Sequence, residues 1–177
     1  MLKKIVGLLA LLILVFCVVA AMQPDDFRYS RSTVISSPPA PIFEIVNTQS
    51  KWEAWSPWAK IDPQMQKTLS GPAAGVGSKY TWSGNSEVGE GSSTIVESVP
   101  NERIAMKLEF VRPFSGVNDV YFTLEPQGNE TKVTWTMAGK NTFLSKAVGL
   151  LMNCEKMLGE QFDTGLAQLK ALVEKPV

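Results

Sequence analysis

The C-terminal part of the sequence constrains the fold most. Between residues 142 and 173, apolar residues recur every three or four positions, with most of the charged residues between them. This is the period of an α-helix, not of a strand. At 1.5 Å per residue, the segment predicts one helix roughly 45 Å long, and its apolar stripe is broader than a coiled-coil seam. Such a helix needs a broad apolar surface to cover it, and we expect the preceding chain to supply that surface.

The preceding chain predicts seven strands and two short helices. Residues 27–35 alternate as a strand, and their polar content favours the edge of a sheet. Serines and prolines at 36–41 end this strand and begin a short helix, and a second short helix covers residues 48–55. From residue 66 the apolar period is two. Turn residues then separate strands at about 67–69, 79–82, 91–99, 103–111, 120–124 and 133–137.

The order of these elements predicts the fold class. Successive strands joined by short turns must be antiparallel, and a sheet of this size twists and curls. A curled sheet with one apolar face forms a groove that the C-terminal helix can fill. The chain is therefore expected to be an α+β domain of about seven antiparallel strands curved around its own long helix. Asn141 or Thr142 is expected to cap the start of that helix.

The N-terminal segment, residues 1–22, predicts a membrane anchor. Lys3 and Lys4 precede a run of 18 uncharged residues from Ile5 to Met22. Such a run is longer than the core of a signal peptide and lies at the short end of the range for a transmembrane helix. With positive charge only on the short side, we expect a single span with the C-terminal domain outside the cytoplasm. Cleavage after small residues near its end, followed by secretion, is the alternative.

Residues 23–26 form a short linker between this segment and the domain of residues 27–175. A linker of four residues spans at most about 14 Å. An uncleaved anchor would therefore hold the domain against the membrane surface.

The composition excludes several kinds of chemistry. The chain has no histidine, the commonest general base and metal ligand. Its two cysteines, Cys17 and Cys154, lie in apolar contexts and define neither a disulfide framework nor a zinc site. Basic and acidic residues are equal at 17 each, without a basic stripe. We therefore expect no metal, no cofactor and no nucleic-acid partner.

The inward positions of the sheet and of the C-terminal helix, together with the tryptophans at 52, 55 and 58, form the predicted ligand cavity. Tyr80 is the only titratable group among the inward sheet positions, and catalysis ordinarily needs an acid, a base or a metal. The pattern therefore favours either apolar binding or a plain core over an enzyme. The predicted cavity residues are Trp52, Trp55, Trp58, Tyr80, Trp82, Met106, Leu108, Phe110, Phe122, Trp135, Met137, Leu151, Cys154, Leu158 and Phe162.

Two features of the sequence leave alternatives open. Trp52, Trp55 and Trp58 lie within seven residues; they either plug one end of the core or line the mouth of a cavity, and Pro57 takes the chain out of helix between them. If Glu97 alternates in phase with Ile95, its side chain points inward. If residues 94, 96 and 98 are the inward positions instead, Glu97 lies in solvent. An inward Glu97 would have a raised pKa from desolvation.

The chain resembles the START-like, or SRPBCC, superfamily over nearly all residues after Asp26. The resemblance implies a helix-grip fold, a seven-stranded antiparallel sheet around a long C-terminal helix with an apolar cavity between them. It is carried by Arg31-Ser32, Ile35, Pro38-Pro39 to Phe43, Trp52, Trp55-Ser56-Pro57-Trp58, Gly71-Pro72, Gly75-Val76-Gly77, Tyr80-Thr81-Trp82-Ser83-Gly84, Val88-Gly89-Glu90-Gly91, Phe122-Thr123-Leu124-Glu125-Pro126, Val133-Thr134-Trp135-Thr136-Met137, Gly159, Phe162, Gly165-Leu166 and Leu169-Lys170.

Members of this superfamily range from lipid carriers to polyketide cyclases and hormone receptors, so the fold does not imply one activity. The leading hypothesis is a membrane-tethered protein that binds a hydrophobic small molecule or lipid without catalysis. The first alternative is an enzyme of the cyclase/dehydrase type that uses Tyr80, Glu97 or a group carried by the ligand. The second is an interaction or stress-related module with a closed core. The space between helix and sheet distinguishes these hypotheses.

Overall fold

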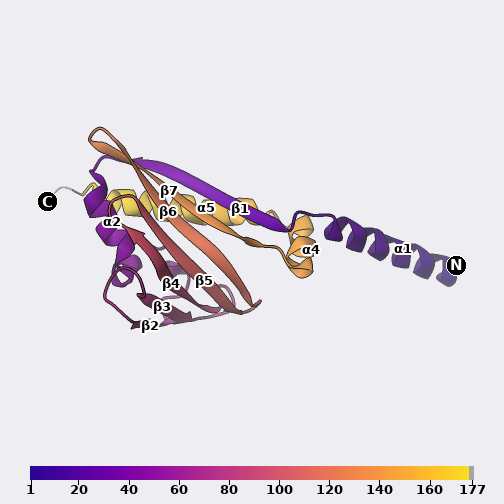
Figure 1. The fold of residues 1–177 in the computed structure, drawn as a ribbon. Coiled ribbons are helices and arrows are strands. Elements are labelled where there is room, and N and C mark those ends of the chain that lie inside the picture. Colours follow the sequence, from indigo (N-terminus) through magenta and orange to yellow (C-terminus); the bar gives the residue numbers. More distant parts are fainter. Residues whose placement is uncertain (176–177) are drawn as a thin grey trace.

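The computed structural model describes residues 1–175 and contains a seven-stranded antiparallel sheet curved around a C-terminal helix (Figure 1). The helices are α1 (Leu2–Ala21), α2 (Pro39–Asn47), the 3₁₀ helix η1 (Gln49–Ala54), α3 (Trp58–Ile61), α4 (Phe143–Leu151) and α5 (Cys154–Val173). The strands are β1 (Asp26–Ile35), β2 (Gln66–Ser70), β3 (Lys79–Ser83), β4 (Glu90–Val99), β5 (Arg103–Arg112), β6 (Gly116–Gln127) and β7 (Glu130–Lys140). The predicted α+β helix-grip fold is confirmed.

The strand order β1-β7-β6-β5-β4-β3-β2 places β1 at one edge, as its polar pattern predicts. Every neighbouring pair is antiparallel. The inward parity of β6 and β7 is also confirmed, because Val120, Phe122, Val133 and Trp135 are all buried. We call the end of the sheet at which β1 begins the α1 end, and the opposite end the far end.

A β-bulge at Val96 explains the two phases of β4. Ile95 pairs with Met106, but the next paired residue is Glu97, opposite Ala105, so Val96 is the extra residue. Ile95 is fully buried, whereas Val96 is exposed. Both phases seen in the sequence are therefore real, one on each side of the bulge. Glu97 faces outward and forms an ion pair of 3.6 Å with Arg103.

The single long C-terminal helix predicted from residues 142–173 is wrong in one respect, because two helices occupy that segment. Met152 has an extended backbone, and the Asn153 side chain accepts a hydrogen bond of 2.9 Å from the Lys156 amide at the start of α5. Thr142 caps α4 in the same way, accepting from the Ser145 amide. The apolar period continues across the break, so periodicity alone does not reveal it.

The segment around Pro57 holds a helix that the sequence did not predict. The chain leaves helical geometry at Trp55, where φ is −134°, two residues before Pro57. Pro57 itself has helical angles and precedes α3, because proline is well suited to the first positions of a helix. Helices η1 and α3 together form a cover over one side of the groove.

The core between α5 and the sheet is solid toward the far end. Leu166 and Leu169 of α5 pack there in one cluster with Ile42 and Val46 of α2, and all four are almost completely buried. The same cluster includes Leu124 and other inward residues of the far half of β6 and β7. Helix α2 therefore closes the far end of the groove, and any space must lie toward the α1 end.

Helix α1 projects away from this domain (Figure 1). It is the one helix among residues 1–175 that is long and apolar enough to cross a membrane, and 6% of its most apolar window is buried. A signal sequence passes the same criterion of length and composition.

Candidate functional site

A pocket of about 240 Å³ lies between the first half of α5, the η1–α3 cover and the inner face of the sheet. Its walls are mostly apolar and aromatic. The lining residues are Trp52, Glu53, Ser56, Trp58, Ala59, Met65, Tyr80, Trp82, Glu87, Val88, Ser93, Met106, Leu108, Phe110, Val120, Trp135, Met137, Leu158 and Phe162. The pocket is slightly smaller than most small-molecule sites, which measure about 300–1,000 Å³.

Eleven of the fifteen predicted cavity residues line this pocket: Trp52, Trp58, Tyr80, Trp82, Met106, Leu108, Phe110, Trp135, Met137, Leu158 and Phe162. The other four lie elsewhere. Trp55 and Phe122 are fully buried and belong to the solid core. Leu151 is 77% exposed at the end of α4, and Cys154 is partly exposed at the start of α5, because the break between these helices directs α4 away from the groove.

The pocket walls include residues that the sequence did not single out. Ala59 lies on the unpredicted helix α3, and Met65 follows it. Val88 lies in the turn between β3 and β4, and Ser93 lies on β4. Small residues in the first half of β4 were the available signal: Gly91 admits the Trp82 ring, which a Cβ atom would meet at 2.7 Å, and Ser93 lines the pocket.

Register and burial explain why the pocket lies toward the α1 end. Leu108 is in register with Ser93, which in turn pairs with Tyr80, and all three line the pocket. The next inward row toward the α1 end contains Phe110 and Trp82, which also line it. Closer to the far end, Ile104, Phe122, Leu124 and Val133 belong to the solid core and do not line the pocket. The hollow therefore occupies one half of the space between helix and sheet.

An aromatic cluster separates the two halves. The rings of Trp135 and Phe162 are stacked with their centroids 4.5 Å apart. Trp58 contacts both rings edge-on, at 5.7 Å from Trp135 and 6.5 Å from Phe162. Trp55 lies behind them, 5.6 Å from Trp135. Both interpretations of the tryptophan cluster thus apply, since Trp55 is core while Trp52 and Trp58 face the pocket.

Buried hydrogen bonds attach the η1–α3 cover to the sheet. The Gln49 amide donates to the Ser93 carbonyl at 3.1 Å, and Ser78 donates to the Gln49 side-chain oxygen at 3.1 Å. The three residues are at most 3% exposed. The Trp52 indole also donates to the Val46 carbonyl at 2.9 Å. These bonds satisfy groups that are costly to bury alone and hold the start of the cover in place.

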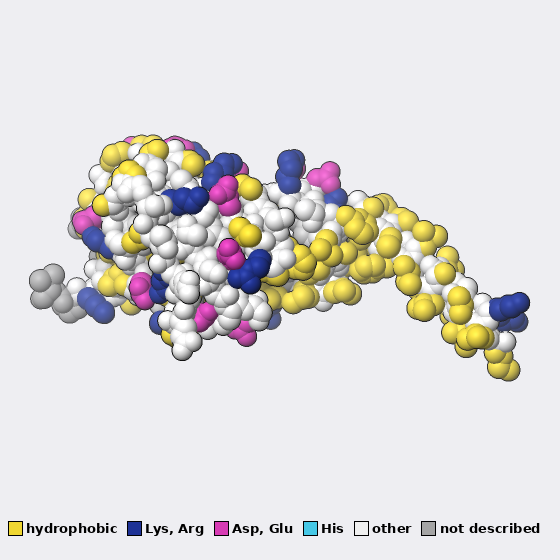
Figure 2. All heavy atoms as spheres, turned by 90° about the horizontal axis from the view of Figure 1, so that it is seen from below, with side chains coloured by type: hydrophobic (Ala, Val, Ile, Leu, Met, Phe, Trp, Pro, Cys, Tyr) yellow, Lys and Arg dark blue, Asp and Glu magenta, His cyan; other side chains and the backbone are white. Residues whose placement is uncertain are grey.

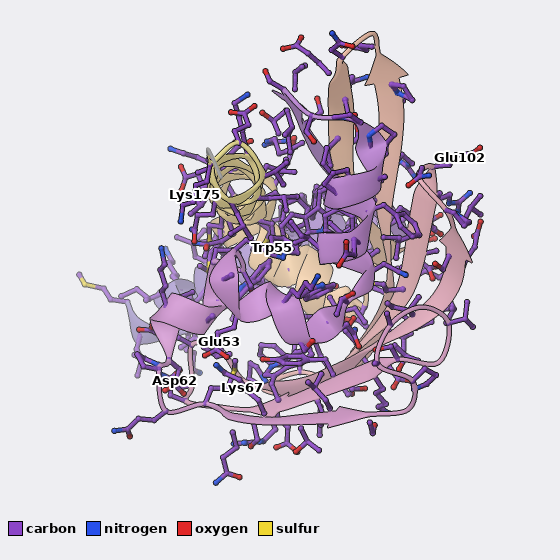
Figure 3. All side chains as sticks on the ribbon, turned by 90° about the vertical axis from the view of Figure 1, so that its left-hand side faces the viewer. Glu53, Trp55, Asp62, Lys67, Glu102 and Lys175 are labelled. Carbon is purple, nitrogen blue, oxygen red and sulfur yellow. The ribbon has the colours of Figure 1, made fainter. Side chains whose placement is uncertain are left out.

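The charged groups of the pocket gather at its rim. Glu53 and Glu87 line the pocket and are solvent-exposed, so they mark its mouth. Glu53 forms an ion pair of 2.7 Å with Lys67 of β2. Figure 3 shows these two side chains facing each other between the cover and the sheet, with Trp55 directed into the interior. Asp62, beyond α3, accepts a hydrogen bond of 2.8 Å from the Asn85 amide in the β3–β4 turn.

Tyr80 is the titratable group deeper in the wall. Burial raises the pKa of its phenol from 10.0 to about 12, with a smaller contribution from the nearby Glu53 carboxylate. The phenol is therefore protonated at neutral pH. Glu97, the other group on which a cyclase-like mechanism would depend, is absent from the pocket lining and faces Arg103 on the outside. Within residues 1–175, no group of three or more acidic or cysteine side chains could hold a metal ion.

Comparisons with known proteins agree with this geometry. The family model for polyketide cyclase / dehydrase and lipid transport matches residues 26–174. The chain is similar in structure to protein CV1439 from Chromobacterium violaceum, with a TM-score of 0.61, 20% identity, and coverage of 87% of this chain and 100% of the other. None of the curated proteins compared with the chain matches it.

Two further solved structures extend this likeness. Ara h 8.0201 aligns with a TM-score of 0.57 at 9% identity, covering 84% of this chain and 97% of the other. The di-domain ARO/CYC BexL from the BE-7585A biosynthetic pathway aligns with a TM-score of 0.63 at 14% identity, covering 90% of this chain and 53% of the other. At such identities these likenesses concern the fold.

Proposed function

Because the chain belongs to the polyketide cyclase / dehydrase and lipid transport family, we propose that it binds a hydrophobic small molecule or lipid without catalysing its conversion. The ligand occupies the pocket between α5 and the sheet, while α1 anchors the domain to a membrane. The positive charges of Lys3 and Lys4 lie on the short side of α1, so the domain faces away from the cytoplasm.

One observation carries this proposal: the pocket is apolar in its depth and has carboxylates only at its rim. Met106, Leu108 and Met137 provide flexible apolar side chains in the wall, and methionine in particular adapts to ligands of irregular shape. Burial raises the pKa of Tyr80, and the rim carboxylate Glu53 is paired with Lys67. The arrangement therefore favours partition of an apolar group over acid–base chemistry.

The expected affinity follows from the size of the pocket. Each buried methylene contributes about 0.8 kcal/mol, so roughly ten of them would supply the 8 kcal/mol that corresponds to a micromolar dissociation constant. Ordering the ligand costs part of this free energy. A pocket of about 240 Å³ is therefore expected to bind an acyl chain or ring system with micromolar or weaker affinity.

The proposal is tested with the full chain in lipid nanodiscs that contain a photoactivatable diazirine palmitic acid. After illumination, mass spectrometry of peptides locates the covalent label. We expect labelling of the strands that carry Met106 and Trp135. Leu108→Trp should fill the pocket and reduce this labelling several-fold, whereas Val96→Trp, at an exposed position on β4, should leave it unchanged. Labelling confined to α1, or equal labelling of both variants, would contradict the proposal.

A further inference from the structure

Two exposed groups of apolar side chains lie at the α1 end of the domain. One group, on α4, comprises Phe143, Leu144 and Leu151; the other, around the β5–β6 turn, comprises Val111, Phe114 and Val117. Leu151 is 77% exposed and Phe114 61%. We call these six residues the apolar end surface. Figure 2 shows apolar side chains continuing from α1 onto the adjoining end of the domain.

Helix α4 exposes an apolar, uncharged face. Its exposed residues Phe143, Leu144 and Leu151 share one face. Phe143 and Leu144 are adjacent, and Leu151 follows Leu144 by seven residues, which is close to two helical turns. The one charged residue in α4 is Lys146, whose side chain is 9% exposed and paired with Asp25. The outer face of α4 thus presents no charge, whereas the exposed faces of typical globular helices are charged or polar.

The contact between α4 and α1 determines where this face lies. The two helices pack against each other, and the α1 residues that lose exposure are Phe16, Cys17 and Ala20. Helix α1 has 20 residues and is about 30 Å long, which equals the thickness of the hydrocarbon core. Phe16 to Ala20 fall within about 8 Å of its C-terminal end. A membrane-spanning α1 therefore holds α4 at the lipid headgroup boundary.

The linker between α1 and β1 is fixed to the domain. The Asn141 amide donates to the Asp25 carbonyl at 2.7 Å, and the Asn141 side chain donates to the Pro24 carbonyl at 3.1 Å. Lys146 and Lys140 form ion pairs with Asp25 and Asp26. These contacts oppose free rotation of the domain about its tether. The same end of the domain is thus kept toward the bilayer.

We infer that the apolar end surface docks onto the lipid bilayer, so that the mouth of the pocket opens beside the membrane and takes its ligand directly from the outer leaflet. The inference rests on the proposed membrane anchor. Two observations support it. The apolar end surface is continuous with α1, and the pocket residues Leu108 and Phe110 lie successively closer to the α1 end of the sheet. The ligand class is accordingly a membrane lipid or another apolar molecule dissolved in the bilayer.

The depth of single nitroxide labels tests this inference. The full chain, with Cys17→Ala and Cys154→Ala, is reconstituted in vesicles of phosphatidylethanolamine and phosphatidylglycerol. Labels are placed at Leu11→Cys, Phe114→Cys, Leu151→Cys and Val76→Cys. Val76 is as exposed as Phe114 but lies near α2, where Gly75 donates to Asn47. Collisions with oxygen and with a water-soluble nickel chelate report the depth of each label.

We expect labels at Phe114 and Leu151 to lie about 5–10 Å inside the headgroup boundary and the label at Val76 to be fully aqueous. If the labels at Phe114, Leu151 and Val76 are all aqueous and the label at Leu11 is buried, the docking is overturned but the proposed anchor stands. An aqueous label at Leu11 would overturn both. Shielding of Phe114 and Leu151 from both reagents alike would indicate a covering protein, such as a second copy, and would also overturn the docking.

A second variant tests the consequence for ligand uptake. Leu144→Asp with Leu151→Asp places charge on the surface without touching the pocket, and Val76→Asp is the matched control. The initial rate of photolabelling by diazirine palmitic acid should fall several-fold in the double variant and stay unchanged in the control. Equal rates in both would overturn uptake from the leaflet, whereas photolabelling of the pocket in either variant would leave the proposed binding function intact.

Discussion

The rings of Trp135 and Phe162 stack at an interplanar angle of 11° with their centroids 4.5 Å apart, and this pair marks the point where a solid core becomes a pocket. Toward the far end, Leu166 and Leu169 pack without space against the sheet. Toward the α1 end, Leu158 lines the pocket. One helix therefore acts as a core element over half its length and as a wall of the binding site over the other half.

Substitution of Gly165 should show how closely α5 approaches the sheet at this boundary. A Cβ atom there would lie 2.7 Å from the Trp135 ring and 3.1 Å from the Pro57 ring. Gly165→Ala gains about 1 kcal/mol of helix propensity, but overpacking a rigid core costs typically 1–3 kcal/mol. We expect a lower free energy of unfolding, measured by thermal denaturation in nanodiscs. Gly149→Ala, with no atom within 4 Å, is the control and should be stabilising; equal effects would contradict the close packing.

Gly159 tests a different kind of close contact in the same helix. A Cβ atom there would meet the Arg31 guanidinium at 2.2 Å, and Arg31 approaches Glu155 and Asp163 on either side at 4.0 and 3.6 Å. The end of an arginine side chain can move, and each exposed ion pair contributes only about 0–1 kcal/mol. The gain in helix propensity, about 1 kcal/mol, offsets this loss. Gly159→Ala should therefore change the free energy of unfolding by less than about 1 kcal/mol, and a loss as large as that of Gly165→Ala would refute this account.

The ion pair between Glu53 and Lys67 crosses the mouth of the pocket and should affect the rate of ligand exchange more than stability. The Glu53 side chain is 72% exposed, so the pair contributes little to folding, about 0–1 kcal/mol. Lys67→Met should increase the rates of ligand entry and exit alike, measured by stopped-flow fluorescence with an anthroyloxy-labelled stearate. Lys132→Met, which breaks an ion pair with Glu125 on the β6–β7 hairpin, is the matched control. Unchanged rates in Lys67→Met would mean that the mouth lies elsewhere.

Tyr80 should make the folded protein less stable at high pH. Below pH 10 its phenol is protonated in both the folded and unfolded chains, so it has no effect on the pH dependence. Because burial raises its pKa from 10.0 to about 12, the unfolded chain ionises first, and stability falls as the pH rises from 10 toward 12. Tyr80→Phe should show a shallower decline over this interval in denaturant titrations, with Tyr121→Phe as reference. Identical slopes for both variants would show that Tyr80 is not buried as described.

Local pattern was enough to predict most of the fold. Alternation along β5, β6 and β7 assigned residues such as Met106, Phe122 and Trp135 to the inner face, because side chains in a strand point to opposite sides in turn. Of the eleven predicted residues that line the pocket, nine followed from this parity and from the helical period, and Trp52 and Trp58 from the tryptophan cluster. Residue types alone also placed β1 at an edge and restricted the N-cap to Asn141 or Thr142, of which the structure uses Thr142.

The ends of the elements and the space between them depend on contacts between residues that are distant in the sequence. A helical period cannot distinguish one helix from two capped helices. The break at Met152 and Asn153 removes Leu151 from the groove. Its position depends on the packing of α4 against α1. The phase at Glu97 depends on a bulge whose extra residue is defined by pairing with β5. The pocket depends on how closely α5 approaches the sheet, and residues that are distant in the sequence set this distance together. Local sequence pattern was enough to show which faces are apolar. How those faces fit together in three dimensions leaves one half of the space between α5 and the sheet filled and the other half open.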